Sequence, residues 1–166
     1  ISQINIRDDT IAKNRFFHDR LFRNRCMFIA DGFYEWKKPE GFERLARGQR
    51  LPKGARKIPY RIVMKNGDPF PLAGLWRSVE MNGRTILSAG IITTRPNSMM
   101  EPIHDRMPVI LADQELNQWL DPSFDNFEAL HRMLDPYDSD RMEAYPVSEF
   151  VNNSRNESPL CIERAV

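Results

Sequence analysis

The sequence predicts an α+β protein, and three observations lead to that prediction. Segments with helical periodicity and segments with strand character are interspersed along the 166 residues. They do not follow the regular strand–helix alternation that a parallel sheet with crossover helices would need. No internal repeat or low-complexity stretch is present. The length is that of one domain with a core large enough to need no disulfides. We therefore expect a single domain over residues 1–166.

The first elements expected are one helix and two strands. A helix is predicted over residues 10–24, with Asp9 or Thr10 as candidate N-cap. Its apolar residues recur mostly at helical spacing: Ile11, Phe16, Phe17, Leu21 and Phe22. Two short strands are predicted within residues 25–36, broken at Asp31 and Gly32, a pair typical of a hairpin or a bend.

The middle of the chain is predicted to be a loop followed by three strands. Residues 37–59 hold three Gly, three Pro and eight Lys/Arg with little apolar periodicity, which favours a loop. Residues 59–79 read as strand, turn at Asn66 and Gly67, strand. Residues 84–94 are rich in β-branched side chains and predict another strand.

The last part is predicted to hold a strand, two helices and a tail. A loop over residues 95–106 leads to a short strand over 107–111. A helix over 112–121 has Asp113 as its expected cap, and a second helix is expected over 123–134. Residues 144–160 are polar and carry prolines, which indicates an extended tail.

The charge distribution is uneven although the net charge is only +1. Residues 13–61 hold 14 Lys/Arg against 5 Asp/Glu, and residues 101–166 hold 5 against 14. Such a chain is able to present a basic face to a polyanion such as nucleic acid, although the two parts can equally neutralise each other in the fold.

The sequence gives no indication of a targeting signal, a transmembrane segment or a metal site. The first ten residues lack the features of a signal peptide, and no apolar run is long enough to cross a bilayer. The two cysteines, Cys26 and Cys161, are far apart, and the three histidines are scattered. We therefore expect no disulfide framework, no metal site and a reducing cytosol.

Glu35 is the first candidate for chemistry, in the run "GFYEW". Strand alternation places Phe33, Glu35 and Lys37 on one face, and Tyr34 and Trp36 on the other. In one interpretation Glu35 faces solvent. In the other it lies in a pocket, where desolvation raises a carboxyl pKa and suits the group to acid–base work.

Other polar residues also have two interpretations each. His104, on a loop that enters a strand, is either a proton carrier in a cleft or bonded to Asp105 or a carbonyl. Arg106 is a surface ion pair or a phosphate clamp. Asn5 and Arg7 share one face if their segment is extended. Two tryptophans and a threonine complete the set: Trp36 and Trp76 are expected in the core unless exposed to stack a base, and Thr93 caps a strand end.

A cysteine nucleophile is not apparent. Cys26 lies in "CMFIA" and reads as a small buried hydrophobe, and Cys161 lies in the tail. Neither is a convincing catalytic thiol. The sequence also lacks a nucleophile-elbow, P-loop or dinucleotide-binding motif.

Taken together, several blocks resemble the SRAP family, the SOS response-associated peptidase-like proteins. These blocks are "NIRDDT", "RCMFIADGFYEWKK", "PYRIVMKNG", "PLAGLW", "IITTRPNSMMEPIHDRMPVIL" and "PVSEFVNNSRNESPLCI", and they run from about residue 4 to residue 162. The resemblance implies a mostly antiparallel, barrel-like or bifurcated sheet flanked by a few helices. It also implies a single SRAP domain that is truncated at its N-terminus, with a basic loop insertion over residues 38–57.

The resemblance implies a chemistry on DNA damage. Family members bind single-stranded DNA at abasic sites and crosslink to it through an N-terminal cysteine, which this chain lacks because it opens with Ile1. The amine condenses with the sugar aldehyde, and the thiol closes the imine to a thiazolidine. Two alternatives are a thiol autopeptidase that removes its own N-terminal residues, and a non-catalytic DNA-binding remnant.

The resemblance also assigns roles to residues. Asn5 resembles the asparagine that orients the cysteine, Glu35 the active-site glutamate, and His104 the histidine that assists opening of the sugar ring. DNA-binding positions are implied for four more residues: Arg7, Trp36, Thr93 and Arg106. No cofactor and no metal are implied. The expected partners are single-stranded and abasic-site DNA, with no membrane, for a monomer in the bacterial cytosol or associated with the nucleoid.

Overall fold

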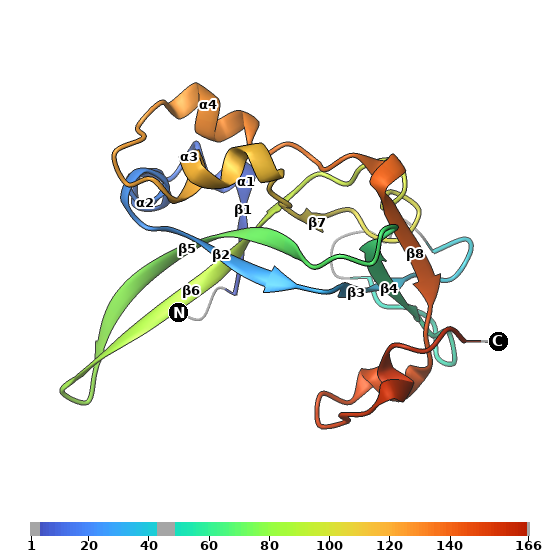
Figure 1. Cartoon of the computed structure of the whole chain (residues 1–166). Coiled ribbons are helices and arrows are strands. Elements are labelled where there is room, and N and C mark those ends of the chain that lie inside the picture. Colours follow the sequence, from blue (N-terminus) through green and yellow to red (C-terminus); the bar gives the residue numbers. More distant parts are fainter. Residues whose placement is uncertain (1–3, 43–48, 166) are drawn as a thin grey trace. The chain divides into compact units, whose positions relative to one another are not determined.

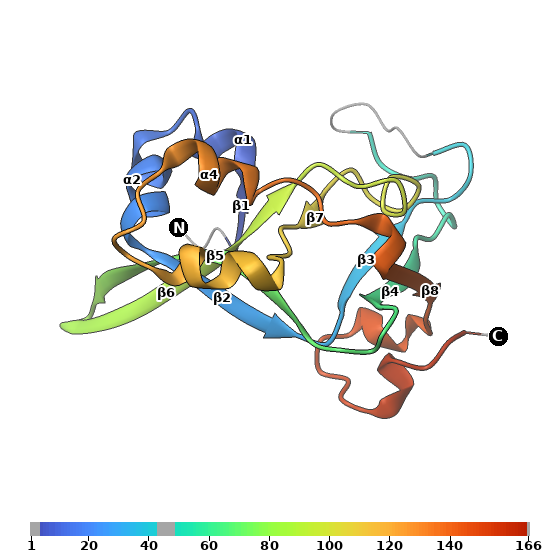
Figure 2. The ribbon, with the colours of Figure 1, turned by 45° about the horizontal axis from the view of Figure 1, so that its top comes forward.

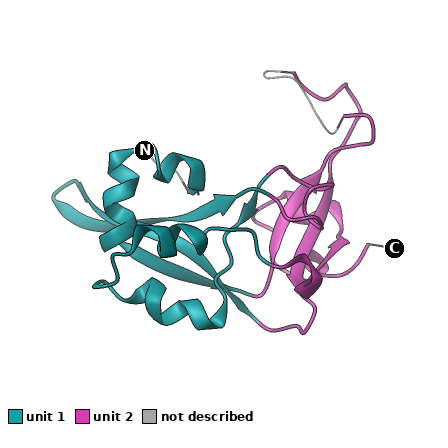
Figure 3. Ribbon diagram, turned by 90° about the horizontal axis from the view of Figure 1, so that it is seen from above, with its two compact units in different colours: residues 1–30, 69–95, 106–137 teal, residues 31–68, 96–105, 138–166 magenta. Residues whose placement is uncertain are grey.

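The computed structural model describes residues 4–42 and 49–165 of the chain (Figure 1). The chain divides into two compact units, coloured separately in Figure 3. Unit 1 comprises residues 1–30, 69–95 and 106–137, and unit 2 comprises residues 31–68, 96–105 and 138–166. Each unit holds its own β-sheet, and short helices accompany them. The predicted α+β class is confirmed, with two separate sheets and no closed barrel among the described residues.

The sheet of unit 1 is mostly antiparallel. Its strand order is β1-β6-β5-β2, formed by β1 (Asn5–Arg7), β6 (Arg84–Thr94), β5 (Phe70–Met81) and β2 (Arg25–Ala30). The short strand β7 (Met107–Pro108) also pairs with β6. Only β1 runs parallel to its neighbour β6. The long β5–β6 hairpin, visible in Figure 2, closes at Asn82 and Gly83, whose φ angles are 51° and 71°, the left-handed pair that a tight type I′ turn requires.

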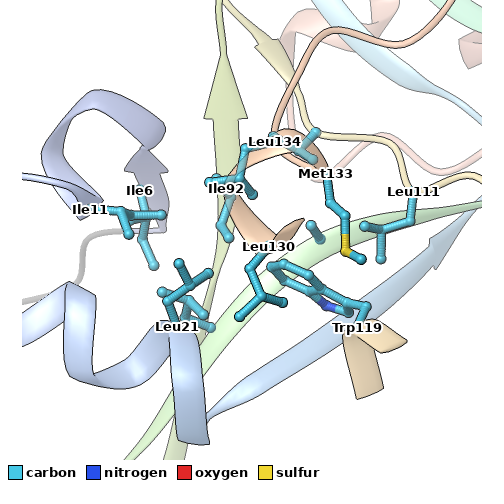
Figure 4. Packing of buried hydrophobic residues seen from close by; sticks show 12 residues of the cluster. Ile6, Ile11, Leu21, Ile92, Leu111, Trp119, Leu130, Met133 and Leu134 are labelled. Carbon is cyan, nitrogen blue, oxygen red and sulfur yellow. The ribbon is translucent and has the colours of Figure 1, made fainter. Parts of the chain in front are cut away.

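Helices among the described residues of unit 1 also contribute to its core. They are α1 (Asp8–Ile11), α2 (Arg15–Arg23), α3 (Leu116–Leu120) and α4 (Phe127–Arg132). Figure 4 shows their buried side chains gathered against residues of the sheet. Trp119, Leu21 and Leu130 are fully buried there, and Ile6 and Ile92 come from neighbouring strands. This apolar cluster holds β1 and β6 in fixed register.

The sheet of unit 2 has three antiparallel strands in the order β3-β4-β8. They are β3 (Phe33–Lys37), β4 (Ile58–Met64) and β8 (Met142–Pro146). Three 3-10 turns accompany them: η2 (Ser139–Arg141), η3 (Glu149–Asn152) and η4 (Pro159–Cys161). The buried apolar side chains among the described residues of this unit include Ile62, Met64, Met100, Ile103, Met142, Tyr145 and Val147.

The prediction of one helix over residues 10–24 is wrong. The chain forms α1 and α2, separated at residues 12–14. The reason lies in Asn14, whose side-chain oxygen accepts a hydrogen bond from the backbone N–H of Phe16 at 2.9 Å. An asparagine that caps a new helix competes with continuation of the preceding one. Neither Asp9 nor Thr10 is the cap, because α1 already begins at Asp8.

Two other predictions concern the ends of strands. Asp31 and Gly32 join a strand of one sheet to a strand of the other, so the bend, one of the two predicted alternatives, is confirmed and the hairpin is wrong. The strand expected over 107–111 is limited to two residues plus a single bridge at Ile110, and Pro108 has no N–H to extend the ladder.

The C-terminal half differs in its helix starts and in its tail. The helix expected over 112–121 starts as a 3-10 turn, η1 (Asp113–Glu115), and Glu115 accepts a hydrogen bond from the backbone N–H of Ala112 at 2.8 Å, so Asp113 is not the cap. The helix expected over 123–134 is shorter, because Asn126 caps it at Phe127. The extended tail is replaced by β8, η3 and η4.

The basic loop expected over residues 38–57 is described in part. Residues 43–48 lie outside the described residues, and the rest of the loop belongs to unit 2.

Within the described part of the chain, every helix is too short or too polar to span a bilayer.

Candidate active site

Glu35 lies at the centre of β3, one of the two edge strands of the unit 2 sheet. It pairs in register with Tyr60 of β4. Its neighbours Tyr34 and Trp36 point to the other face because side chains alternate along a strand. There the Tyr34 hydroxyl donates to the carbonyl of Cys161 at 3.1 Å, and the Trp36 Nε1–H donates to Asn152 Oδ1 at 2.7 Å. The C-terminal turns therefore occupy the face opposite Glu35.

His104 is held by a compact turn over residues 97–104. The backbone N–H of His104 donates to the carbonyl of Met100 at 2.9 Å, and the backbone N–H of Met100 donates to the side chain of Asn97 at 3.0 Å. The buried side chains of Met100 and Ile103 anchor this turn in unit 2. The imidazole is thus positioned by packing on the residues just before it.

These two segments bring Glu35 and His104 together. Glu35 Oε2 lies 3.7 Å from His104 Nε2, and Asp105 Oδ1 lies 3.3 Å from His104 Nδ1. The side chains of Glu35 and His104 are 24% and 34% exposed. Glu35 is therefore largely shielded from solvent beside His104, and the alternative in which strand alternation directs it to solvent is wrong.

Burial raises the pKa of the Glu35 carboxyl above its usual value. His104, a hydrogen bond from the backbone N–H of Trp36 and the charge of Lys57 act in the opposite direction, and burial prevails. A carboxyl with a raised pKa next to an imidazole is a pair that can donate and accept protons in the same site.

Space for a reactant adjoins the imidazole. A cavity of about 260 Å³ is lined by His104, Asp105 and residues of the same turn, together with Lys38 after β3. A shallower pocket borders Trp36 and is lined by Arg56, Lys57, Glu149 and Asn152, with Arg56 Nη1 2.9 Å from Glu149 Oε2. Unit 2 therefore has a cavity next to His104 of the acid–base pair, and a second pocket that Trp36 lines together with Arg56 and Lys57.

Arg106 belongs to unit 1 and is engaged in a polar network there. Its guanidinium donates to Asp8 Oδ1 at 2.7 Å, to the carbonyl of Thr93, and to Thr93 Oγ1 at 3.2 Å. The Thr94 hydroxyl donates to the second oxygen of Asp8 at 2.8 Å. The side chains of Arg106 and Asp8 are 16% and 19% exposed. Sequence reasoning missed Asp8, because its position directly after Arg7 in "RDD" suggests a surface acid.

Arg7 and Asn5 lie on β1. Arg7 is in register with Thr93 of β6, and Asn5 with Ile91. Both are exposed. Arg7 donates two hydrogen bonds to Asp9, at 3.0 and 2.7 Å. This bond from Arg7 lowers the pKa of Asp9 to about 2.

The structure thus groups the candidates in two sets. Glu35 and His104 meet in unit 2, where Trp36 lies on the same strand as Glu35. Arg7, Thr93 and Arg106 meet in unit 1. Asn5 belongs to unit 1, and a pocket shared with Glu35 and His104 stays a prediction.

Cys26 and Cys161 each lie in surroundings that give no sign of a catalytic thiol. Cys26 is partly buried on β2, and burial raises the pKa of its thiol. Such a shift makes the reactive thiolate scarcer at neutral pH. The Cys161 thiol donates to the carbonyl of Asn156 at 3.6 Å. Neither environment activates a nucleophile.

The fold and the site define an α+β protein with two sheets and a carboxylate–imidazole pair on the three-stranded one. The same fold occurs in a crystal structure of a protein from Bacteroides thetaiotaomicron, with a TM-score of 0.79, 31% sequence identity, and coverage of 98% of this chain and 66% of that one. A protein from Bordetella bronchiseptica is also similar, with a TM-score of 0.68 and 25% identity over 87% of this chain and 64% of that one.

The chain belongs to the SRAP family, because the family profile "SOS response associated peptidase (SRAP)" matches residues 1–154. The chain is similar to the abasic site processing protein YoqW of Bacillus subtilis, with 43% identity over 163 residues. It is also similar to the abasic site processing protein HMCES of Xenopus tropicalis, with 35% identity over 170 residues. The alignments cover 96% and 95% of this chain, and 66% and 49% of the relatives' lengths.

Proposed function

We propose that this protein processes abasic sites in DNA. The relatives YoqW and HMCES carry that activity in their names. The observation on this chain that carries the proposal is the pair formed by Glu35 and His104, 3.7 Å apart beside a cavity. An abasic site presents an aldehyde after its sugar ring opens, and both ring opening and attack on the aldehyde require proton transfers that such a pair can perform.

The proposed reaction forms a covalent crosslink to the lesion. The nucleophile is an N-terminal cysteine that this sequence does not contain. Its α-amine attacks the aldehyde carbon, the carbonyl oxygen leaves as water, and the resulting imine carbon accepts the cysteine thiolate to close a thiazolidine ring. The thiol proton passes to the imine nitrogen, so the ring closure is balanced and needs no oxidant.

Glu35 and His104 have distinct parts in this proposal. His104 assists opening of the sugar ring by proton transfer. Glu35, with its raised carboxyl pKa, protonates the departing hydroxyl and then accepts the thiol proton. Asn5 orients the cysteine. No cofactor or metal takes part in any of these steps.

Recognition of the DNA strand is assigned to Arg7, Trp36, Thr93 and Arg106. Arg7 is exposed on β1, and Trp36 borders Arg56 and Lys57. Thr93 and Arg106 adjoin Arg7 in the register of β1 and β6. The proposed ligand is single-stranded DNA, bound by a monomer in the bacterial cytosol or nucleoid. Such binding depends on phosphate contacts and therefore weakens as salt increases.

The test uses the full-length protein and a single-stranded oligonucleotide with one abasic site. The expected result is an adduct that survives denaturing electrophoresis and whose peptide, by mass spectrometry, is N-terminal. An undamaged oligonucleotide of the same sequence is the control and should give none. Absence of an adduct with the abasic strand, in a preparation that is folded and has the expected N-terminus, would refute the proposal.

A second candidate function is self-processing, favoured by the word peptidase in the family description. The same pair would then activate a thiol that attacks the carbonyl preceding it in the chain. Mass spectrometry of the mature N-terminus after expression with Glu35→Gln decides this. An uncleaved leader in the variant supports self-processing by this site, and a normally trimmed N-terminus counts against it.

A further inference from the structure

The imidazole of His104 lies between two carboxyl groups of unit 2. Its Nε2 faces Glu35 Oε2 at 3.7 Å, and its Nδ1 faces Asp105 Oδ1 at 3.3 Å. The proposed reaction uses Glu35 and leaves Asp105 without a role. The surroundings of the two carboxyl groups differ, because the Asp105 side chain is 87% exposed and the Glu35 side chain is 24% exposed. This difference decides which imidazole nitrogen carries the proton.

The backbone places Asp105 at the imidazole. The backbone N–H groups of Ile103 and His104 both donate to the carbonyl of Met100, at 2.8 and 2.9 Å, and the side chains of Met100 and Ile103 are buried. Asp105 follows this turn directly, so its short side chain reaches Nδ1 from the neighbouring position in the chain. An ion pair this exposed adds little to stability. Its effect is therefore expected on the imidazole and not on folding.

A neutral imidazole has one N–H and one lone pair, and hydrogen bonding decides which nitrogen holds which. Burial raises the pKa of the Glu35 carboxyl, which favours the protonated form, an O–H donor. The negative charge of Asp105 acts on Glu35 in the same direction. The exposed carboxylate of Asp105 offers oxygens that only accept. Both contacts are satisfied when the N–H is on Nδ1, towards Asp105, and the lone pair is on Nε2, towards Glu35.

We propose that Asp105 is the positioning residue of His104, which accepts the Nδ1–H and thereby directs the Nε2 lone pair towards Glu35. The inference rests on the proposed function, in which His104 assists opening of the sugar ring. Nε2 takes the proton of the anomeric hydroxyl, the bond from that carbon to the ring oxygen breaks as the aldehyde forms, and the ring oxygen takes a proton from Glu35. The imidazolium between Asp105 and Glu35 then returns a proton to Glu35, which balances the cycle. A tautomer with its proton on Nε2 is unable to accept the first proton.

The first test determines the tautomer and needs no DNA. In proton–nitrogen correlation spectra of the isotope-labelled full-length protein in mildly alkaline buffer, the two-bond pattern of a neutral imidazole distinguishes Nδ1–H from Nε2–H. His104→Gln identifies the His104 signals by their loss. We expect Nδ1–H in the wild type and a mixture of both forms in Asp105→Ala. Asp140→Ala, which removes another exposed aspartate of unit 2, is the matched control and should leave the pattern unchanged. Nε2–H in the wild type, or the same pattern in Asp105→Ala, would overturn the proposal.

The second test measures crosslinking to the abasic oligonucleotide under single-turnover conditions. Asp105→Ala should slow it about tenfold, the low end for a hydrogen bond to a charged group, because the contact is exposed. Asp105→Asn keeps an accepting oxygen and should therefore retain more of the rate. It loses the charge that helps to raise the pKa of Glu35, so its rate should decline with rising pH at a lower pH than that of the wild type.

The other charged groups around the pair are the same in all these variants. Lys38 and Glu101 line the cavity next to His104, and the charge of Lys57 acts on Glu35. A shift of the pH profile is therefore due to Asp105. Unchanged melting temperatures would show that the variants fold.

Failure of this inference differs from failure of the proposed function. A wild type that forms no adduct refutes abasic-site crosslinking, and the spectra still decide the tautomer. A wild type that forms the adduct, together with a normal rate in Asp105→Ala or an equal loss in Asp140→Ala, would show that Asp105 does not position His104.

Discussion

The acids Asp8 in unit 1 and Glu35 in unit 2 are similarly shielded from water, with side chains 19% and 24% exposed, yet they face different partners. Asp8 receives a guanidinium bond at 2.7 Å and a hydroxyl bond at 2.8 Å. Glu35 faces an imidazole at 3.7 Å, beyond direct hydrogen-bond length.

The two pairs have different roles. The Asp8–Arg106 pair supports the structure of unit 1, and the Glu35–His104 pair is arranged for proton transfer in unit 2. Arg106 offers Asp8 a planar guanidinium fork that suits a carboxylate, so this pair supports the structure. His104 offers Glu35 an imidazole, a group that can both donate and accept a proton, so this pair suits proton transfer. Partial burial alone therefore does not mark an active acid, and the identity of the partner decides.

The largest expected effect separates the two acids by activity. Glu35→Gln in the full-length protein should slow crosslinking to an abasic oligonucleotide about a hundredfold or more, since general acid–base groups contribute about 10²–10⁴. Glu143→Gln is the matched control, because Glu143 lies in the same unit and pairs with Arg164 instead of an imidazole. Rates are measured by denaturing electrophoresis. A normal rate for Glu35→Gln would remove the carboxyl from the mechanism.

The next effect concerns the stability of unit 1. Arg106→Met leaves Asp8 shielded without its cation, and should lower the free energy of unfolding by about 3 kcal/mol. Arg7→Met removes a pair whose side chains are 56% and 48% exposed, and should cost less than about 1 kcal/mol. Denaturant titration of both variants checks the contrast. Equal losses of stability in the two variants would show that the Asp8–Arg106 pair contributes no more to folding than the exposed Arg7–Asp9 pair.

A smaller effect appears in the pH dependence of stability. Burial raises the pKa of Glu35, so the folded state holds this proton to higher pH than the unfolded state. Stability due to Glu35 should therefore fall as pH rises from about 4.5 to the raised pKa, and stay level beyond it. The difference in unfolding free energy between wild type and Glu35→Gln measures this. A difference that rises with pH would contradict the assignment.

The smallest effect has the opposite sign and belongs to Asp9. Its pKa is lowered to about 2 by the hydrogen bond from Arg7, so its stabilisation is present above its ordinary value of 3.8 and is lost as pH falls towards 2. Asp9→Asn should be slightly less stable than wild type at neutral pH and should approach it only below about pH 2. Added salt should shrink the difference, because the pair is exposed. A stability difference between Asp9→Asn and wild type that persists at acid pH would mean that Asp9 acts through packing.

Sequence patterns located the strands better than the helix boundaries. Strand alternation correctly separated Glu35 from Tyr34 and Trp36, and β-branched runs indicated β6. The break between α1 and α2 escaped because Asn14 fits both the middle of an amphipathic pattern and a cap. Trp119 is the tryptophan fully buried in the core, whereas Trp76, expected there, lies in a cavity wall.

The sequence by itself determined the α+β class and the family, and it supplied the candidates for the reactive side chains. Only the tertiary structure decided that Glu35 and His104, which are 69 positions apart, lie 3.7 Å from each other. It also decided that Arg106 is held by Asp8, because an ion pair between residues so distant in the chain depends on the register of β1 against β6. The periodicity of a sequence predicts the face of an element on which a side chain lies, whereas long-range packing determines which residues that side chain contacts.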